Sequence, residues 1–171
     1  MPLICLVLAG CGSDKKIDEV EQEHKVFSTA DFAFRMPEHW SFLESKSTPE
    51  QVVFQAQDSG AQLMISIMKF DQTASAKEAT EAFSRVVEHR REAEQNQAPP
   101  PDELTPIDSK QGEALSYARW YGKVKETDQC SATLVTLENN KLFTLFIERQ
   151  GIDPQAIADL SQELFANFKV K

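Results

Sequence analysis

The chain has 171 residues and a formal net charge of −9, a length that suits one domain with a sizeable hydrophobic core. An acidic protein is a poor partner for nucleic acid and for an anionic membrane surface, so both partner classes are disfavoured. The apolar run over residues 3–8 is far shorter than the roughly 20 residues of a membrane-spanning helix.

The N-terminus carries the first predicted element. Residues 3–8 are uninterruptedly apolar, two small residues follow, and dense charge begins only after Cys11. This order is typical of a secretory signal. The stretch Leu8-Ala9-Gly10-Cys11 resembles the lipobox of bacterial lipoproteins, which implies a signal peptide over residues 1–10 and a diacylglyceryl group on Cys11. The alternative is a buried N-terminal strand in which Cys11 is an ordinary small apolar residue.

The lipoprotein resemblance also implies a location. Lipoproteins carry two or three acyl chains, and at about 0.8 kcal/mol per buried methylene such an anchor is effectively permanent. Gly12 follows the cysteine where Asp would retain a lipoprotein at the inner membrane, so the outer membrane facing the periplasm is implied. Residues 11–26 are predicted to be a polar tether, and residues 27–171 the folded domain.

Strands dominate the first half of the predicted domain. Alternating apolar residues predict them, and Asp58-Ser59-Gly60 predicts a hairpin turn between the last two. The predicted strands are residues 32–36, 40–44, 51–57 and 63–70. The last of them is apolar on both faces, so both of its faces are expected to be covered.

Two helices interrupt and close the strand series. Ser75 and Glu78 have capping-box spacing, and an apolar stripe of helical period follows as far as Val87. The second helix begins at Asp153, with Pro154 in its first turn, and its apolar positions continue to Phe168. Three strands lie between the helices, over residues 115–126, 131–137 and 142–149.

The order of strands, helix, strands and helix predicts an α+β fold, with an antiparallel sheet flanked by helices. Phe32-Ala33-Phe34-Arg35-Met36-Pro37, followed by Trp40, and the elements after it resemble the PsbP-like superfamily and its DcrB-like lipoproteins. The resemblance implies an α/β/α sandwich. It also implies a non-enzymatic accessory or binding module beside membrane complexes, or a chaperone for apolar segments.

Residue patterns for catalysis or cofactor binding are lacking. His24, His39 and His89 have no neighbouring ligand at metal-binding spacing, and no glycine-rich phosphate loop or nucleophile elbow occurs. No catalytic residue, metal or cofactor is therefore predicted. Cys130 lies at the edge of an apolar-alternating run, which favours a buried strand residue over a reactive thiol.

Trp120 and Tyr121 are the best candidates for a recognition surface, because tryptophan and tyrosine are enriched in binding hot spots. They are adjacent in a strand, so one faces each side of the sheet, and core packing is the competing interpretation. The strand segment Met64–Met68 has the same two interpretations, an adaptable groove or plain core.

The main hypothesis is a lipid-anchored, non-catalytic accessory or binding protein of the periplasm with a protein partner in the envelope. One alternative is a chaperone-like module, which requires an exposed apolar groove. The other is an envelope hydrolase, which requires a cleft with paired, pKa-shifted carboxylates or an activated nucleophile.

Overall fold

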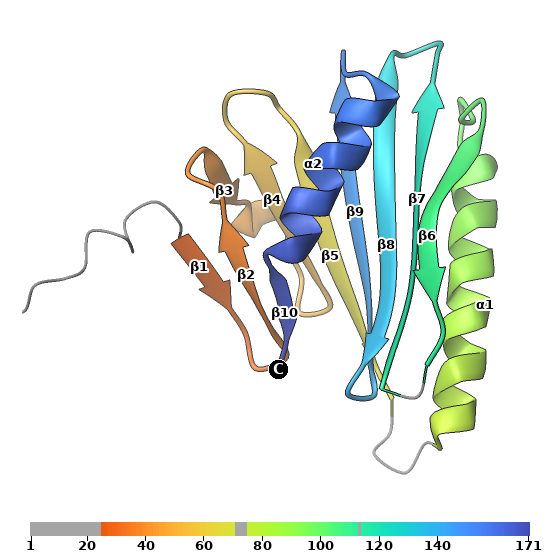
Figure 1. Cartoon of the computed structure of the whole chain (residues 1–171). Coiled ribbons are helices and arrows are strands. Elements are labelled where there is room, and N and C mark those ends of the chain that lie inside the picture. Colours follow the sequence, from red (N-terminus) through yellow and green to blue (C-terminus); the bar gives the residue numbers. More distant parts are fainter. Residues whose placement is uncertain (1–24, 71–74, 113) are drawn as a thin grey trace, which may run out of the picture.

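The computed structural model describes residues 25–70, 75–112 and 114–171. The predicted signal peptide, Cys11 and nearly all of the predicted tether lie outside the described residues. Most of the described strands form a seven-stranded antiparallel sheet in the order β3-β4-β5-β9-β8-β7-β6 (Figure 1). Their bounds are β3 Trp40–Phe42, β4 Gln51–Ala56, β5 Gln62–Lys69, β6 Leu104–Lys110, β7 Leu115–Val124, β8 Gln129–Glu138 and β9 Lys141–Gln150.

A second, three-stranded sheet has the order β1-β2-β10. Its strands are β1 Lys25–Ser28, β2 Phe32–Met36 and β10 Phe168–Val170. This small sheet and helix α2, Pro154–Ala166, pack side by side on one face of the large sheet, which we call the α2 face (Figure 1). Helix α1, Ala76–Gln95, packs on the opposite face, the α1 face.

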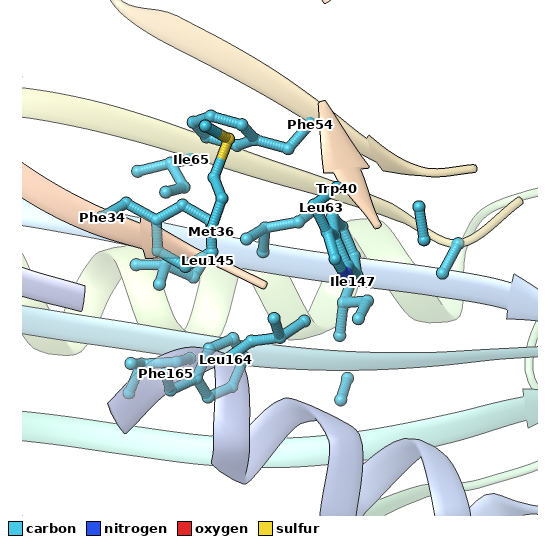
Figure 2. Packing of buried hydrophobic residues seen from close by; sticks show 14 of the residues in the cluster. Phe34, Met36, Trp40, Phe54, Leu63, Ile65, Leu145, Ile147, Leu164 and Phe165 are labelled. Atoms are coloured by element: carbon cyan, nitrogen blue, oxygen red, sulfur yellow. The ribbon is translucent and has the colours of Figure 1, made fainter. Parts of the chain in front are cut away.

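The main core lies between the large sheet and its cover on the α2 face. Every second residue of β2 points into it, and Phe34 meets Phe54 of β4 with ring centroids 5.0 Å apart. Figure 2 shows these rings together with Leu145 of β9 and Leu164 of α2. Fully burying one such side chain contributes about 1.5–3 kcal/mol, so this cluster joins the two sheets and α2 into one unit.

Helix α1 begins as the sequence predicts. The Ser75 hydroxyl accepts a hydrogen bond from the Glu78 amide, and the Glu78 carboxylate accepts one from the Ser75 amide. Ala79 and Phe83 then pack on the α1 face. Because α1 contacts mainly β7 and β8, the α1 face of β5 stays partly open, and Met68 is 51% exposed. The expectation that both faces of β5 are covered is therefore wrong for the α1 face.

The α+β prediction is confirmed, but the small sheet was not predicted. Helical spacing predicts Phe168 in the last helix, whereas the chain leaves α2 at Asn167 and Phe168 begins β10. Strand β6 was also missed, because Pro106 and the bulge at Ile107 interrupt its alternation. Strand β1 begins at Lys25, inside the predicted tether. No helix among the described residues is long and apolar enough to cross a membrane.

Candidate functional site: a groove between β7 and α2–β10

The two predicted recognition residues lie on opposite faces of β7. Tyr121 is half-buried on the α2 face. Trp120 is only 1% exposed and packs under α1, so it belongs to the interior and is not available as a recognition surface. The prediction that the pair splits between the two faces is confirmed, and core packing is the correct interpretation for Trp120.

A buried carboxylate explains why Trp120 is held inside. Glu94, in the last turn of α1, accepts hydrogen bonds from Trp120 Nε1 at 2.8 Å and from the Thr133 hydroxyl at 2.7 Å. Arg90, one turn earlier, donates to the same carboxylate at 2.8 Å and lies over the ring of Phe146. These contacts fasten α1 to β7, β8 and β9. The charged run of α1 around Arg90 and Arg91 is thus partly used for packing, since Arg91 lies over the Trp120 ring.

A cavity with a volume of about 640 Å³ lies on the α2 face, between β7 and the end of α2. Strand β7 forms one wall, β8 forms the floor, and the last turn of α2 with all of β10 forms the other wall. The side chains that define this groove are Tyr117, Arg119, Leu134, Phe165, Phe168 and Val170. Its lining is mainly apolar, which is typical of a site that binds an apolar segment rather than a charged metabolite.

A single guanidinium lies in the β7 wall. Arg119 donates two hydrogen bonds to Asp108 of β6, with Nε to Oδ1 at 2.6 Å and Nη2 to Oδ2 at 2.5 Å. These hydrogen bonds hold the pKa of Asp108 below its usual value and raise the pKa of Arg119. Asp108 occupies one side of the guanidinium fork, and within the described part of the chain the other side has no hydrogen-bond partner, so it can meet an acceptor in the groove.

Among the described residues, no carboxyl group with a resolved pKa shift has a raised pKa. The four carboxyl groups with a resolved shift among the described residues, Asp31, Glu78, Asp102 and Asp108, all have lowered pKa values, each through a hydrogen-bond donor. A general acid requires a raised carboxyl pKa instead. Cys130 is buried, as predicted, and burial raises the pKa of its thiol, which is the opposite of an activated nucleophile. No metal-binding cluster occurs among the described residues.

The Met64–Met68 segment lines a smaller depression on the α1 face. Met64 and Phe146 border it together with Val53, and its volume is about 210 Å³. Met68 lies beyond it and is exposed. This depression has about a third of the volume of the groove, so we regard the groove as the candidate site.

The predicted recognition residue Tyr121 lies on the α2 face but is not among the residues that line the groove, and the residues that do line it were not predicted. Tyr117 and Arg119 lie on the same face of β7 as Tyr121. Residues two apart on a strand point to the same face, so the sequence spacing does indicate that these three side chains are neighbours. Helical spacing in the sequence predicts both Phe165 and Phe168 in the core-facing stripe of the last helix. Their role in the groove depends on α2 ending at Asn167, which apolar periodicity alone does not reveal.

Comparisons with known proteins bear on the fold. No protein-family model and no curated protein matches the chain. Among solved structures it is similar to the cyanobacterial PsbP (CyanoP) of Synechocystis sp. PCC 6803, with 16% identity and a TM-score of 0.59, covering 96% of this chain and 99% of that one. It is also similar to LpqN of Mycobacterium tuberculosis, a protein involved in cell envelope biogenesis, with 11% identity and a TM-score of 0.51 over 86% and 90% of the two chains.

A third similar structure is a protein of Bacteroides thetaiotaomicron, with 18% identity and a TM-score of 0.54. The match covers 87% of this chain but 49% of that protein, so the chain spans about half of its length. At these identities the likeness shows the fold alone. The fold is PsbP-like, as the sequence predicted. The DcrB-like subgroup and the lipoprotein resemblance stay predictions.

Proposed function

We propose that this chain is a non-catalytic accessory protein of the bacterial cell envelope, which binds a partner protein in the groove between β7 and α2–β10. The observation that carries the proposal is the groove itself. An open, mainly apolar cavity of about 640 Å³ is bordered by aromatic side chains and one guanidinium, the residue types enriched in binding hot spots.

The envelope location is supported from two directions. LpqN has a similar fold and is involved in cell envelope biogenesis. The N-terminal sequence resembles a lipoprotein signal, so the proposal includes lipidation of Cys11 and, because Gly12 follows it, the outer membrane facing the periplasm. In cell fractionation, a Cys11→Ala variant is then expected to leave the membrane fraction. Retention of this variant in that fraction would remove the lipid anchor from the proposal.

The non-catalytic role is supported by the titratable groups. The shifted carboxyl groups of the described residues have pKa values moved in the wrong direction for a general acid, and burial raises the pKa of the Cys130 thiol. The hydrolase alternative requires raised carboxyl pKa values or an activated nucleophile, so it receives no support from the described part of the chain.

A chaperone-like role for apolar client segments is the second candidate, and a specific observation favours it. It requires an exposed apolar surface, and the structure offers both the groove and the exposed Met68. The two roles differ in selectivity. An accessory protein binds one partner stoichiometrically, whereas a chaperone binds many unfolded chains with similar affinity.

Site-specific photo-crosslinking in intact cells that make the full chain tests the proposal. A photoreactive phenylalanine analogue replaces Tyr117 in the groove, and in a control protein it replaces the exposed Lys77 on α1. We expect one dominant adduct from position 117 that is absent from position 77. Many weak adducts from position 117 would favour the chaperone-like role. Equal adduct patterns from the two positions would refute the groove as the binding site.

A further inference from the structure

We infer that the occupant of the groove is an extended segment of the partner, which pairs with the free edge of β10 and adds a strand to the small sheet. This inference rests on the proposed function and specifies how the groove binds. It concerns a different part of the site from the apolar lining, namely the main-chain groups of Phe168 and Val170.

The ladder between β10 and β2 shows where these main-chain groups point. Lys169 is opposite Ala33, and hydrogen bonds on either side of this pair join Arg35 N–H to Asn167 O and Lys171 N–H to Asp31 O. Along a strand of an antiparallel pair, the N–H and C=O groups of successive residues point alternately toward the partner strand and away from it. The N–H and C=O groups of Phe168 and Val170 are therefore directed away from β2, toward the groove.

Nothing in the described part of the chain continues the sheet on that side. Strand β10 is the last strand in the order β1-β2-β10, and all three of its residues line the groove. An unpaired edge beside an apolar floor is the arrangement that peptide-binding domains use for strand addition. The nearby edge of the large sheet differs, because Pro106 and the bulge at Ile107 in β6 obstruct pairing there.

The side chains of β10 define the chemistry of the added segment. Directly opposite residues of neighbouring strands share a face, so partner residues opposite Phe168 and Val170 point down toward Tyr117 and Leu134 on the groove lining. The residue between them points outward beside the exposed Lys169. Lys169 is cationic, so charge complementarity favours an acidic residue there. The expected pattern is apolar, acidic, apolar.

A defined peptide probe tests this inference on the full chain with Cys11→Ala. The probe is a short acetylated peptide with the central sequence Val-Glu-Val, titrated while amide resonances of the protein are followed by NMR. Saturable binding is expected, with the largest shifts at Phe168, Val170 and Tyr117. A peptide with Val-Lys-Val is expected to bind about threefold more weakly, through loss of the cross-strand charge pair. N-methylation of the amides that face β10 is expected to abolish binding.

A matched pair of proline variants tests the edge on the protein side. Val170→Pro removes an N–H that is directed away from β2, and we expect about tenfold weaker binding of the Val-Glu-Val peptide. Val26→Pro makes the same change in β1, the other outer strand of the small sheet among the described residues. The Val26 N–H is also directed away from β2, and this variant is expected to bind like the parent.

Three outcomes would overturn the inference: no binding of the Val-Glu-Val peptide, equal binding by the Val170→Pro variant and the parent, or tolerance of N-methylation. The N-methylated peptide needs no change to the protein, so the test holds even if Val170→Pro disturbs folding. A specific adduct from position 117 together with any of these outcomes would leave the proposed function intact and refute strand addition. Loss of the adduct would count against the proposed function itself.

Discussion

Trp120 Nε1 donates a hydrogen bond of 2.8 Å to the carboxylate of Glu94, which is 4% exposed in the last turn of α1. The Thr133 hydroxyl and the Arg90 guanidinium complete the set of donors to this carboxylate. A buried anion with all its donors in place is stable, whereas removal of one partner leaves buried polar groups unpaired. The packing of α1 on the large sheet is therefore expected to depend strongly on Glu94.

Glu94→Ala is expected to lower the free energy of unfolding by about 3 kcal/mol, because Trp120 Nε1 and the Thr133 hydroxyl lose their acceptor inside the protein. Glu94→Gln keeps one acceptor oxygen and is expected to cost about half as much. Urea denaturation followed by tryptophan fluorescence measures both values. A cost below about 1 kcal/mol for Glu94→Ala would show that the carboxylate does not hold α1 in place.

The Asp108–Arg119 pair is expected to make stability depend on acid pH. The hydrogen bonds from Arg119 lower the folded-state pKa of Asp108 below its ordinary value of 3.8. The contribution of the Asp108–Arg119 pair to the free energy of unfolding is thus fully present above pH 3.8. It is lost as the pH falls through the lower folded-state pKa of Asp108. Asp108→Asn is therefore expected to be less stable than the parent near neutral pH, with a difference that shrinks below pH 3.8. A difference that does not change with pH would contradict this account.

The Cys130 thiol is expected to be inert in the folded protein. It is fully buried, it donates to the Ile152 carbonyl at 3.1 Å, and burial raises its pKa, so little thiolate is present at neutral pH. Mass spectrometry of the Cys130 peptide after iodoacetamide treatment is expected to show slow alkylation of the native protein and rapid alkylation in urea. Rapid alkylation of the native protein would place the thiol at an accessible position.

Phe34 is expected to be essential for holding the small sheet on the large one. Its ring is fully buried against Phe54, so Phe34→Ala is expected to cost about 3–5 kcal/mol in the free energy of unfolding. Arg35→Ala, on the exposed side of the same strand, is expected to change it by less than about 0.5 kcal/mol. Similar costs for the two variants would mean that the sheets do not share one core.

Local signals in the sequence were sufficient to predict the strands with clear apolar alternation and the helices with a clear N-cap. The capping box at Ser75, the Asp153 cap and the strands of the large sheet other than β6 were predicted within a few residues of their observed bounds. The small sheet was missed because its strands come from opposite ends of the chain. Phe168 pairs with Phe34, and no local pattern indicates a contact over that separation.

The groove was harder to predict than the fold. Residue type favours both Trp120 and Tyr121 as recognition residues, but burial decides which aromatic side chain is accessible. The burial of Trp120 depends on Glu94 and α1. Tyr117 and Arg119 were detectable as neighbours of Tyr121 on one strand face. The opposite wall of the groove was not detectable, because it depends on where α2 ends and where β10 lies.

The most direct test of the central claim compares two neighbouring residues of α2 in the crosslinking experiment. Gln162 is exposed and lines the groove, whereas Glu163 is exposed and lies outside it. Gln162→Trp is expected to fill the groove and abolish the adduct formed from position 117, while Glu163→Trp is expected to leave the adduct yield at the parent level. Equal adduct yields from the two variants would contradict binding in the groove.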